Sequence, residues 1–167
     1  MIITDINSFL AYYAKVKART TRLFDHIPAD KIEWSYREGK FTIGDIVRHL
    51  ALIERKMYGE NVRLLPSKYQ GCGPEYASGL EEVIQFYHDQ HQEALAIFRQ
   101  LSPEHLQRKC PTPGGIQITT WKWLRAMVEH EIHHRGQLYT YLGMLDVKTP
   151  PIYGLTAEQV IENSQSE

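Results

Sequence analysis

The sequence has almost no excess charge of either sign, few cysteines and no long apolar run. Its 19 lysine and arginine residues nearly balance 20 aspartate and glutamate residues, and no basic stretch is interleaved with aromatic residues, so the footprint of a nucleic-acid-binding protein is absent. No apolar stretch approaches the roughly 20 residues of a membrane-spanning helix, and polar residues interrupt positions 1–24 too often for a signal-peptide core. We therefore expect a cytoplasmic protein that binds neither nucleic acid nor a membrane.

Length and cysteine content indicate one domain that needs no covalent crosslink. A chain of 167 residues is long enough to bury a stable core, and we assign residues 1–167 to a single domain. The two cysteines, Cys72 and Cys110, lie in segments rich in glycine and proline. A reducing compartment disfavours a structural disulfide, so we expect both to be bystanders.

Four segments carry the three-and-four spacing of apolar residues that is typical of amphipathic helices. They lie at about 4–24, 42–57, 78–101 and 119–145. The expected N-terminal caps are Thr4 for the first segment, Thr42 with Asp45 for the second, and Ser78 with Glu81 for the third. With no convincing run of strands, these segments predict an all-α fold, a four-helix bundle.

Short helices and long loops complete this expected bundle. Ser102 and Pro103 begin a short turn, and Thr156 with Gln159 is expected to cap a C-terminal helix that docks on the bundle or on a second subunit. The longest loop, at about 61–77, is rich in glycine and proline, and loops of this length are often functional.

Three histidines on the inward faces of these helices predict a metal site. His130 and His134 are four residues apart, so their imidazoles lie on one face of a helix and can bind one ion. His49, on the apolar stripe of the second helix, is the expected third ligand. Three neutral imidazoles with open coordination positions suit a divalent metal that also binds water or substrate. All-nitrogen ligation favours Zn or Ni, with Fe, Cu and Mn as alternatives.

Polar residues near these histidines are candidates for supporting roles. Asp45, one turn before His49, is expected either to orient that imidazole or to act only as a helix cap. His133 could also reach the metal, but it lies beside the stripe that carries His134 and is expected at the rim of the site or in support of the ligands. Gln137 is either a surface amide or a partner of the ligands, and the first interpretation is favoured.

Further residues have both a structural and a functional interpretation. His88 and His91, three residues apart, would form a second metal site or line the cavity, and packing is favoured because no third ligand is evident. Tyr141 belongs to the core or to the wall of a substrate pocket. Glu131 is the one candidate catalytic base, although adjacent helix positions diverge by about 100°, which favours pairing with a neighbouring helix.

His130, Glu131 and His134 also match HExxH, the pattern of zinc peptidases in which the glutamate acts as a general base. A peptidase of that kind takes its third ligand downstream, where only Glu158 and Glu162 lie near a suitable distance. It also offers a sheet edge to the substrate, which an all-helical chain lacks. The peptidase is therefore the weakest hypothesis.

The stretch GGIQITTWKWLRAMVEHEIHHRGQLYTYLGML, together with FTIGDIVRHLALIE, resembles the DinB superfamily of DinB/YfiT-like four-helix-bundle metalloproteins. The resemblance spans nearly the whole chain, and the HRGQL run is its most specific element. It implies that His49, His130 and His134 bind the metal, and that two copies of the chain form a homodimer. Relatives include transferases and isomerases that use low-molecular-weight thiols, and others described as metal-dependent hydrolases.

Two functional classes remain open at this point. The first is an enzyme whose metal activates water or a thiol cosubstrate against a small-molecule substrate, as a transferase or a hydrolase. The second is a non-catalytic dimeric bundle that binds metal for stability or sensing. A shared fold does not establish a shared reaction, so the resemblance does not choose between these classes. An open coordination position on the metal would distinguish the first class from the second.

Overall fold

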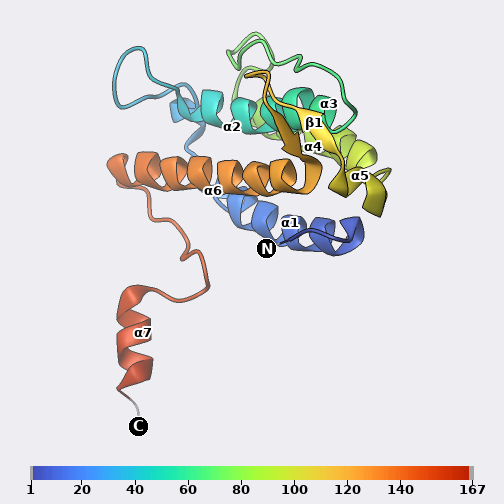
Figure 1. The fold of residues 1–167 in the computed structure, drawn as a ribbon. Coiled ribbons are helices and arrows are strands. Elements are labelled where there is room, and N and C mark those ends of the chain that lie inside the picture. The colour runs from blue at the N-terminus through green and yellow to red at the C-terminus, as the bar shows by residue number, and fades with distance from the viewer. Residues whose placement is uncertain (1, 166–167) are drawn as a thin grey trace.

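The computed structural model describes residues 2–165, and its long helices form the expected four-helix bundle (Figure 1). Helix α2 packs against α4 and α6, and α1 packs against α6. The long helices are α1 (Ile6–Thr21), α2 (Ile43–Leu52), α4 (Leu80–Phe98) and α6 (Thr120–Met144). The short helices are η1 (Phe24–His26), η2 (Ala29–Lys31), α3 (Gly59–Asn61), α5 (Pro103–Gln107) and α7 (Ala157–Ser164).

Helix α2 does not stop at Leu52 but continues through a π-helical segment, η3 (Ile53–Tyr58), into α3. A π-helical turn corresponds to one additional residue within an α-helix and often occurs at functional sites. The continuous rod from Ile43 to Asn61 packs against α6 through α2 and η3. The α6 rod is long because apolar residues recur along it without an interrupting proline.

Helix caps agree with the sequence-based expectation at α2 and α7 and differ at two other helices. Thr42 and Asp45 form the predicted capping box of α2. The cap of α1 is Asp5 rather than Thr4, because its carboxylate accepts a hydrogen bond from the Ser8 amide at 2.7 Å.

The predicted capping box of Ser78 and Glu81 is wrong, because α4 begins after Gly79. Gly79 has a φ of 82°, a left-handed conformation that an L-residue adopts with strain, so the chain turns at this glycine. The Ser78 amide instead donates to Glu82 at 3.2 Å.

The bundle is filled by two groups of buried apolar side chains, one toward each end. Phe98, Leu106 and Leu124 are fully buried in the first, which lies between α1, α4, α5 and the start of α6. Tyr87 and Leu138 are fully buried in the second, between α2, α4 and the end of α6. Burying such side chains supplies most of the stability of a helical bundle.

Two short elements lie outside the bundle. Strands β1 (Lys109–Pro111) and β2 (Gln117–Thr119) pair in an antiparallel hairpin between α5 and α6, in register Cys110 with Ile118. Helix α7 has the predicted capping box of Thr156 and Gln159, yet it projects away from the bundle and none of its residues is buried (Figure 1). Within residues 2–165, no helix combines the length and the hydropathy needed to cross a membrane.

Candidate metal centre

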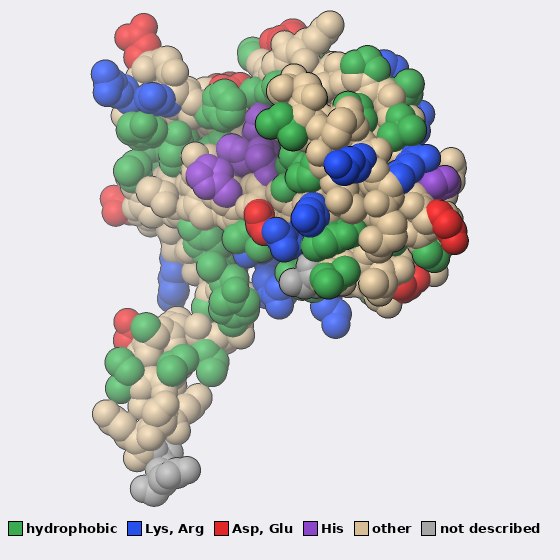
Figure 2. Space-filling view, viewed as in Figure 1, with side chains coloured by type: hydrophobic (Ala, Val, Ile, Leu, Met, Phe, Trp, Pro, Cys, Tyr) green, Lys and Arg blue, Asp and Glu red, His purple; other side chains and the backbone are tan. Residues whose placement is uncertain are grey.

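The side chains of His49, His130 and His134 meet between α2 and α6. His130 Nε2 lies 3.1 Å from His49 Nε2 and 3.1 Å from His134 Nε2. Ligand atoms of the three rings all lie within 4.8 Å of one another. Figure 2 shows histidine side chains gathered between these two helices on the face turned to the viewer. The structure thus brings together the three residues that the sequence predicts as ligands.

The arrangement of these nitrogens fits a metal ion. Nitrogen ligands at about 2.0–2.1 Å from one ion, at adjacent positions of a tetrahedron or an octahedron, are about 2.8–3.4 Å apart. The two 3.1 Å separations lie in this range. The nitrogen of a neutral imidazole is either a donor or an acceptor, so three Nε2 atoms cannot each form a hydrogen bond with both of the others. One cation, by contrast, can bind the lone pairs of all three rings. The cluster is therefore of a kind that can hold a metal.

Burial keeps these histidines neutral, which is the form that binds metal. Burial and the neighbouring His134 lower the pKa of His49 from its ordinary 6.5 to about 4. Burial lowers the pKa of His130 to about 3, with further contributions from His134 and His49. Burial also lowers the pKa of His134, although its hydrogen bond to Gln137 acts in the opposite direction. At neutral pH no proton has to leave before a metal binds.

These lowered pKa values predict an acid-sensitive metal-free protein. Between the folded pKa values, about 3 to 4, and the unfolded value, 6.5, the unfolded chain binds more protons, so the free energy of unfolding falls as pH decreases. With allowance for the partial exposure of the rings, we expect a loss of about 2 kcal/mol between pH 7 and pH 5. Urea unfolding of chelator-treated protein at the two pH values measures it. A His130→Ala variant with an equally steep dependence would contradict this assignment.

Hydrogen bonds at the opposite nitrogens hold two of the rings in position. His134 Nδ1 lies 2.6 Å from Gln137 Oε1, an acceptor, so Nδ1 carries the proton and Nε2 presents its lone pair. His49 Nδ1 lies 2.8 Å from the Tyr69 hydroxyl, which accepts in the same way when Nε2 binds metal. Gln137 therefore touches a predicted ligand and is more than the surface amide that the sequence favoured.

Replacement of Tyr69 by phenylalanine is expected to weaken metal binding by about 10- to 100-fold, because His49 loses the partner that orients its ring. Competition with a chromophoric chelator measures the change. Tyr76→Phe is the matched control, since Tyr76 lies on the same loop, is 36% exposed and packs its ring against Phe86. Equal affinities of the Tyr69→Phe protein and the wild type would contradict the orienting role.

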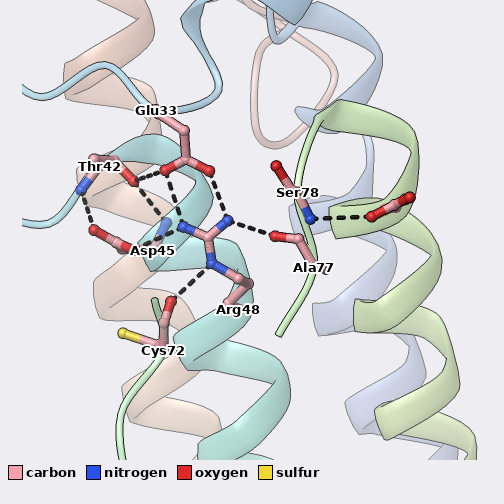
Figure 3. Close-up of polar contacts among 8 residues, drawn as sticks. Glu33, Thr42, Asp45, Arg48, Cys72, Ala77 and Ser78 are labelled. Atoms are coloured by element: carbon pink, nitrogen blue, oxygen red, sulfur yellow. Dashed lines mark hydrogen bonds and ion pairs between the residues drawn. The ribbon is translucent and has the colours of Figure 1, made fainter. Parts of the chain in front are cut away.

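Arg48, next to His49 in α2, fastens the loop that carries Tyr69 (Figure 3). Its fully buried guanidinium donates to the carbonyls of Cys72 at 2.7 Å and Ala77 at 3.0 Å. It also donates to Glu33 and to Asp45, each at 2.7 Å. Because five donors on one rigid fork are shared between helix and loop, the loop is fixed relative to α2.

Asp45 acts through this network and as a helix cap. Its carboxylate accepts from the Thr42 amide at 2.9 Å and from Arg48. Both of its oxygens are engaged there, so the orienting contact to His49 that the sequence allowed is made by Tyr69 instead.

Glu131 is committed to the bundle interior, which does not agree with a role as catalytic base. Its side chain is 2% exposed, and its oxygens accept from Tyr87 at 2.9 Å and pair with Lys17 at 3.5 Å. Lys17 also pairs with Glu54 at 2.8 Å, and Glu54 contacts His91 Nδ1 at 2.7 Å. Four helical segments thus contribute to one buried ionic cluster, defined as Lys17, Glu54, Tyr87, His91 and Glu131. Glu131 faces this ionic cluster rather than the three histidines, because adjacent side chains on an α-helix point about 100° apart.

The other candidate residues lie around the site or apart from it. His133 is exposed, and its ring lies 4.9 Å from that of His134, at the rim as expected. Tyr141 is 7% exposed and donates to the Phe41 carbonyl at 3.1 Å. Together with Gln137 it lines a cavity of about 390 Å³. His88 is exposed on α4, with its ring 6.5 Å from that of Phe24, and His91 belongs to the ionic cluster.

The placement of the C-terminal carboxylates argues against the zinc-peptidase hypothesis. Glu158 and Glu162 lie on α7, which projects away from the bundle (Figure 1). The third imidazole at the cluster comes from α2, upstream of the HExxH pattern. The glutamate of that pattern faces Lys17 rather than the three rings.

Sequence patterns did not indicate Tyr69, Arg48 or Lys17. Tyr69 lies in a loop, where periodicity carries no information on position. Arg48 and Lys17 occupy inward positions of their helices. Charged residues are almost never fully buried unless they are paired, so their inward positions could have indicated buried ion pairs.

Comparisons with known proteins identify the family and the fold of the chain. The sequence model of the DinB superfamily matches residues 12–138. The uncharacterized protein YjoA of Bacillus subtilis is 23% identical over 150 residues, which cover 88% of this chain and 95% of YjoA.

A crystal structure of YjoA superposes with a TM-score of 0.68 at 17% identity, over 89% of this chain and 99% of that chain. A DinB-like protein from Bacillus cereus superposes with a TM-score of 0.75 at 16% identity, over 90% of this chain and 99% of that one. The four-helix bundle protein TT2238 gives 0.63 at 21% identity, over 81% and 99%. The chain belongs to the DinB superfamily.

Proposed function

We propose that this protein is a metal-dependent enzyme that acts on a small molecule, with His49, His130 and His134 as the ligands of a divalent ion. The convergence of three Nε2 atoms, with two separations of 3.1 Å, carries the proposal. Zn or Ni is the expected ion, and Fe, Cu or Mn would suit the same nitrogens. Three protein ligands leave coordination positions for a reactant, as catalytic sites require.

A bound divalent ion supplies a Lewis acid that lowers the pKa of water or of a thiol, or polarises a carbonyl. The residues of the chain hold this centre in place. Gln137 fixes the tautomer of His134, Tyr69 contacts His49 Nδ1, and the centroid of the Phe41 ring lies 5.3 Å from that of the His49 ring. Transfer to or from a low-molecular-weight thiol cosubstrate and hydrolysis both suit this arrangement. With Glu131 in the buried cluster, a bound ion would lower the pKa of its water or thiol, and the proton would pass to solvent.

Substitution with cobalt tests the proposal. We expect Co(II) to bind with one equivalent per chain and to give visible absorption bands of a nitrogen-ligated site. Addition of N-acetylcysteine is expected to change these bands, because its thiolate enters an open position. A spectrum that no thiol, imidazole or azide perturbs would contradict an open site and support the non-catalytic metal-binding bundle. Failure of Co(II), Zn(II) and Ni(II) to bind would overturn both classes.

The assembly is proposed to be a homodimer. Val160 and Ile161 of α7 are 48% and 57% exposed, and α7 buries none of its side chains on its own bundle, which favours contact with another chain. Sedimentation equilibrium tests this proposal, and a monomer at concentrations of tens of micromolar would contradict it.

A further inference from the structure

A cavity of about 620 Å³ lies between the long loop, residues 62–79, and the β1–β2 hairpin. Its volume is within the range of roughly 300–1,000 Å³ that is usual for small-molecule sites. Pro66 and Ser67 of the loop face Pro111 and Thr112 of the hairpin across it. Met57, from the π-helical segment, also lines the cavity, so one wall is continuous with the helix that carries His49.

Tyr69 connects this cavity to the three histidines. Tyr69 lines the cavity while its hydroxyl lies 2.8 Å from His49 Nδ1. On the opposite helix, Trp123 Nε1 donates to Asn61 Oδ1 at 3.3 Å, and Trp123 precedes His130 by two turns of α6. The cavity wall is therefore tied to His49 through Tyr69 and to α6 through the Asn61–Trp123 hydrogen bond.

The walls of this cavity are neutral. The residues that line it include no lysine, arginine, aspartate, glutamate or histidine, and its polar groups are hydroxyls and one amide. Ser67 Oγ accepts from the Tyr69 amide at 3.2 Å and keeps its own proton for a ligand. Within residues 2–165 the Thr112 hydroxyl has no side-chain hydrogen bond. By contrast, Lys56 and Lys68 line a separate cavity of about 460 Å³ that also includes Ser67 and Tyr69.

We propose that the 620 Å³ cavity is the substrate pocket of the metal centre and that it takes an uncharged, partly apolar group, aromatic or aliphatic, that bears a carbonyl or amide. A charged group would lose its hydration there without gaining a counter-ion, whereas a neutral one gains apolar contact with Met57 and hydrogen bonds from Ser67 and Thr112. This inference rests on the proposed function, because it assigns the substrate class of that same site.

Methionine methyl resonances provide the test. In zinc-loaded, full-length protein labelled with ¹³C at the methionine methyl groups, benzamide is the neutral probe, and benzoate and benzylammonium are its charged counterparts. We expect benzamide to shift the Met57 resonance and to leave that of Met144, 56% exposed at the end of α6, unchanged. The charged probes are expected to bind at least roughly tenfold more weakly. No shift of Met57 by benzamide, or equal binding of benzoate, overturns the proposal.

Variants locate the binding to this cavity. Thr112→Trp fills it from the hairpin and Ser67→Trp fills it from the loop, and either change is expected to abolish the shift of Met57. Ile116→Trp is the matched control, because Ile116 is 70% exposed at the tip of the same hairpin. Persistent benzamide binding in both filled variants overturns the proposal.

A His130→Ala protein separates this proposal from that of the metal function. It is expected to lose the metal and still bind benzamide. Cobalt binding without a Met57 shift in the wild type rejects the pocket alone, whereas a Met57 shift without metal binding in the wild type rejects the proposed function.

Discussion

Replacement of Lys17 by methionine is expected to lower the free energy of unfolding by about 3–5 kcal/mol. Lys17 is 4% exposed, and its ammonium is the cation that lies between the carboxylates of Glu54 and Glu131. Methionine has a similar length, so the change removes the charge and leaves little void. Glu131 then lacks a compensating cation and Glu54 keeps only its contact with His91, and removal of one partner is the costly way to break a buried ion pair. A loss of this size is a large fraction of the roughly 5–15 kcal/mol that stabilises a typical domain.

Chemical denaturation followed by circular dichroism at pH 7 measures this effect. Lys15→Met is the matched control, because Lys15 lies on the same helix and is exposed, and we expect it to change stability by less than about 0.5 kcal/mol. Adding Glu54→Gln and Glu131→Gln to Lys17→Met is expected to restore part of the lost stability, since the uncompensated charges are removed. Equal stability of the Lys17→Met protein and the wild type would show that the cluster contributes no net stabilisation through its charge.

Replacement of His134 by alanine is expected to weaken metal binding by about 100- to 1,000-fold. Binding of zinc to structural sites is worth about 10–16 kcal/mol, so one of a few ligands contributes about 3–4 kcal/mol. The helix itself should persist, because its stability depends on buried apolar residues such as Leu138 and Leu142. Elemental analysis after dialysis and competition with a chelator measure the change, and circular dichroism reports the fold.

The neighbouring histidine provides the control for that experiment. His133 is exposed at the rim, so His133→Ala is expected to retain metal within about tenfold of the wild-type affinity. Unchanged metal content in the His134→Ala protein would contradict the ligand assignment. Equal losses in the two variants would indicate binding by a different set of atoms.

Periodicity and capping chemistry predicted most of the helical fold. The segment expected at about 119–145 is α6, Thr120–Met144, and Thr42 caps α2 as its capping box predicts. The first turn of α4 was misjudged because Gly79 takes a left-handed conformation, which depends on how the loop arrives. A cap motif is a local signal, whereas the choice between adjacent caps is decided by tertiary contacts.

The candidate site was likewise predictable only where local spacing determines it. The spacing of His130 and His134 places both rings on one helix face, so their proximity follows from the sequence. The approach of His49 depends on how α2 and α6 pack, and only its position on an apolar stripe pointed to it. Tyr69 was beyond prediction, because its place beside His49 depends on the buried hydrogen bonds of Arg48 to carbonyls 24 and 29 residues away.

The π-helical segment Ile53–Tyr58 determines which residues of this helix face the proposed pocket. Its wide turn holds one residue more than a regular α-helix would need over the same path. An in-frame deletion of one residue there would restore ordinary winding and rotate everything that follows by about 100°. Met57 and Asn61 would then swing out of the cavity, while His49, upstream of the change, would stay in place. Deletion of this residue would therefore change the lining of the proposed pocket and leave the trio of imidazoles in place.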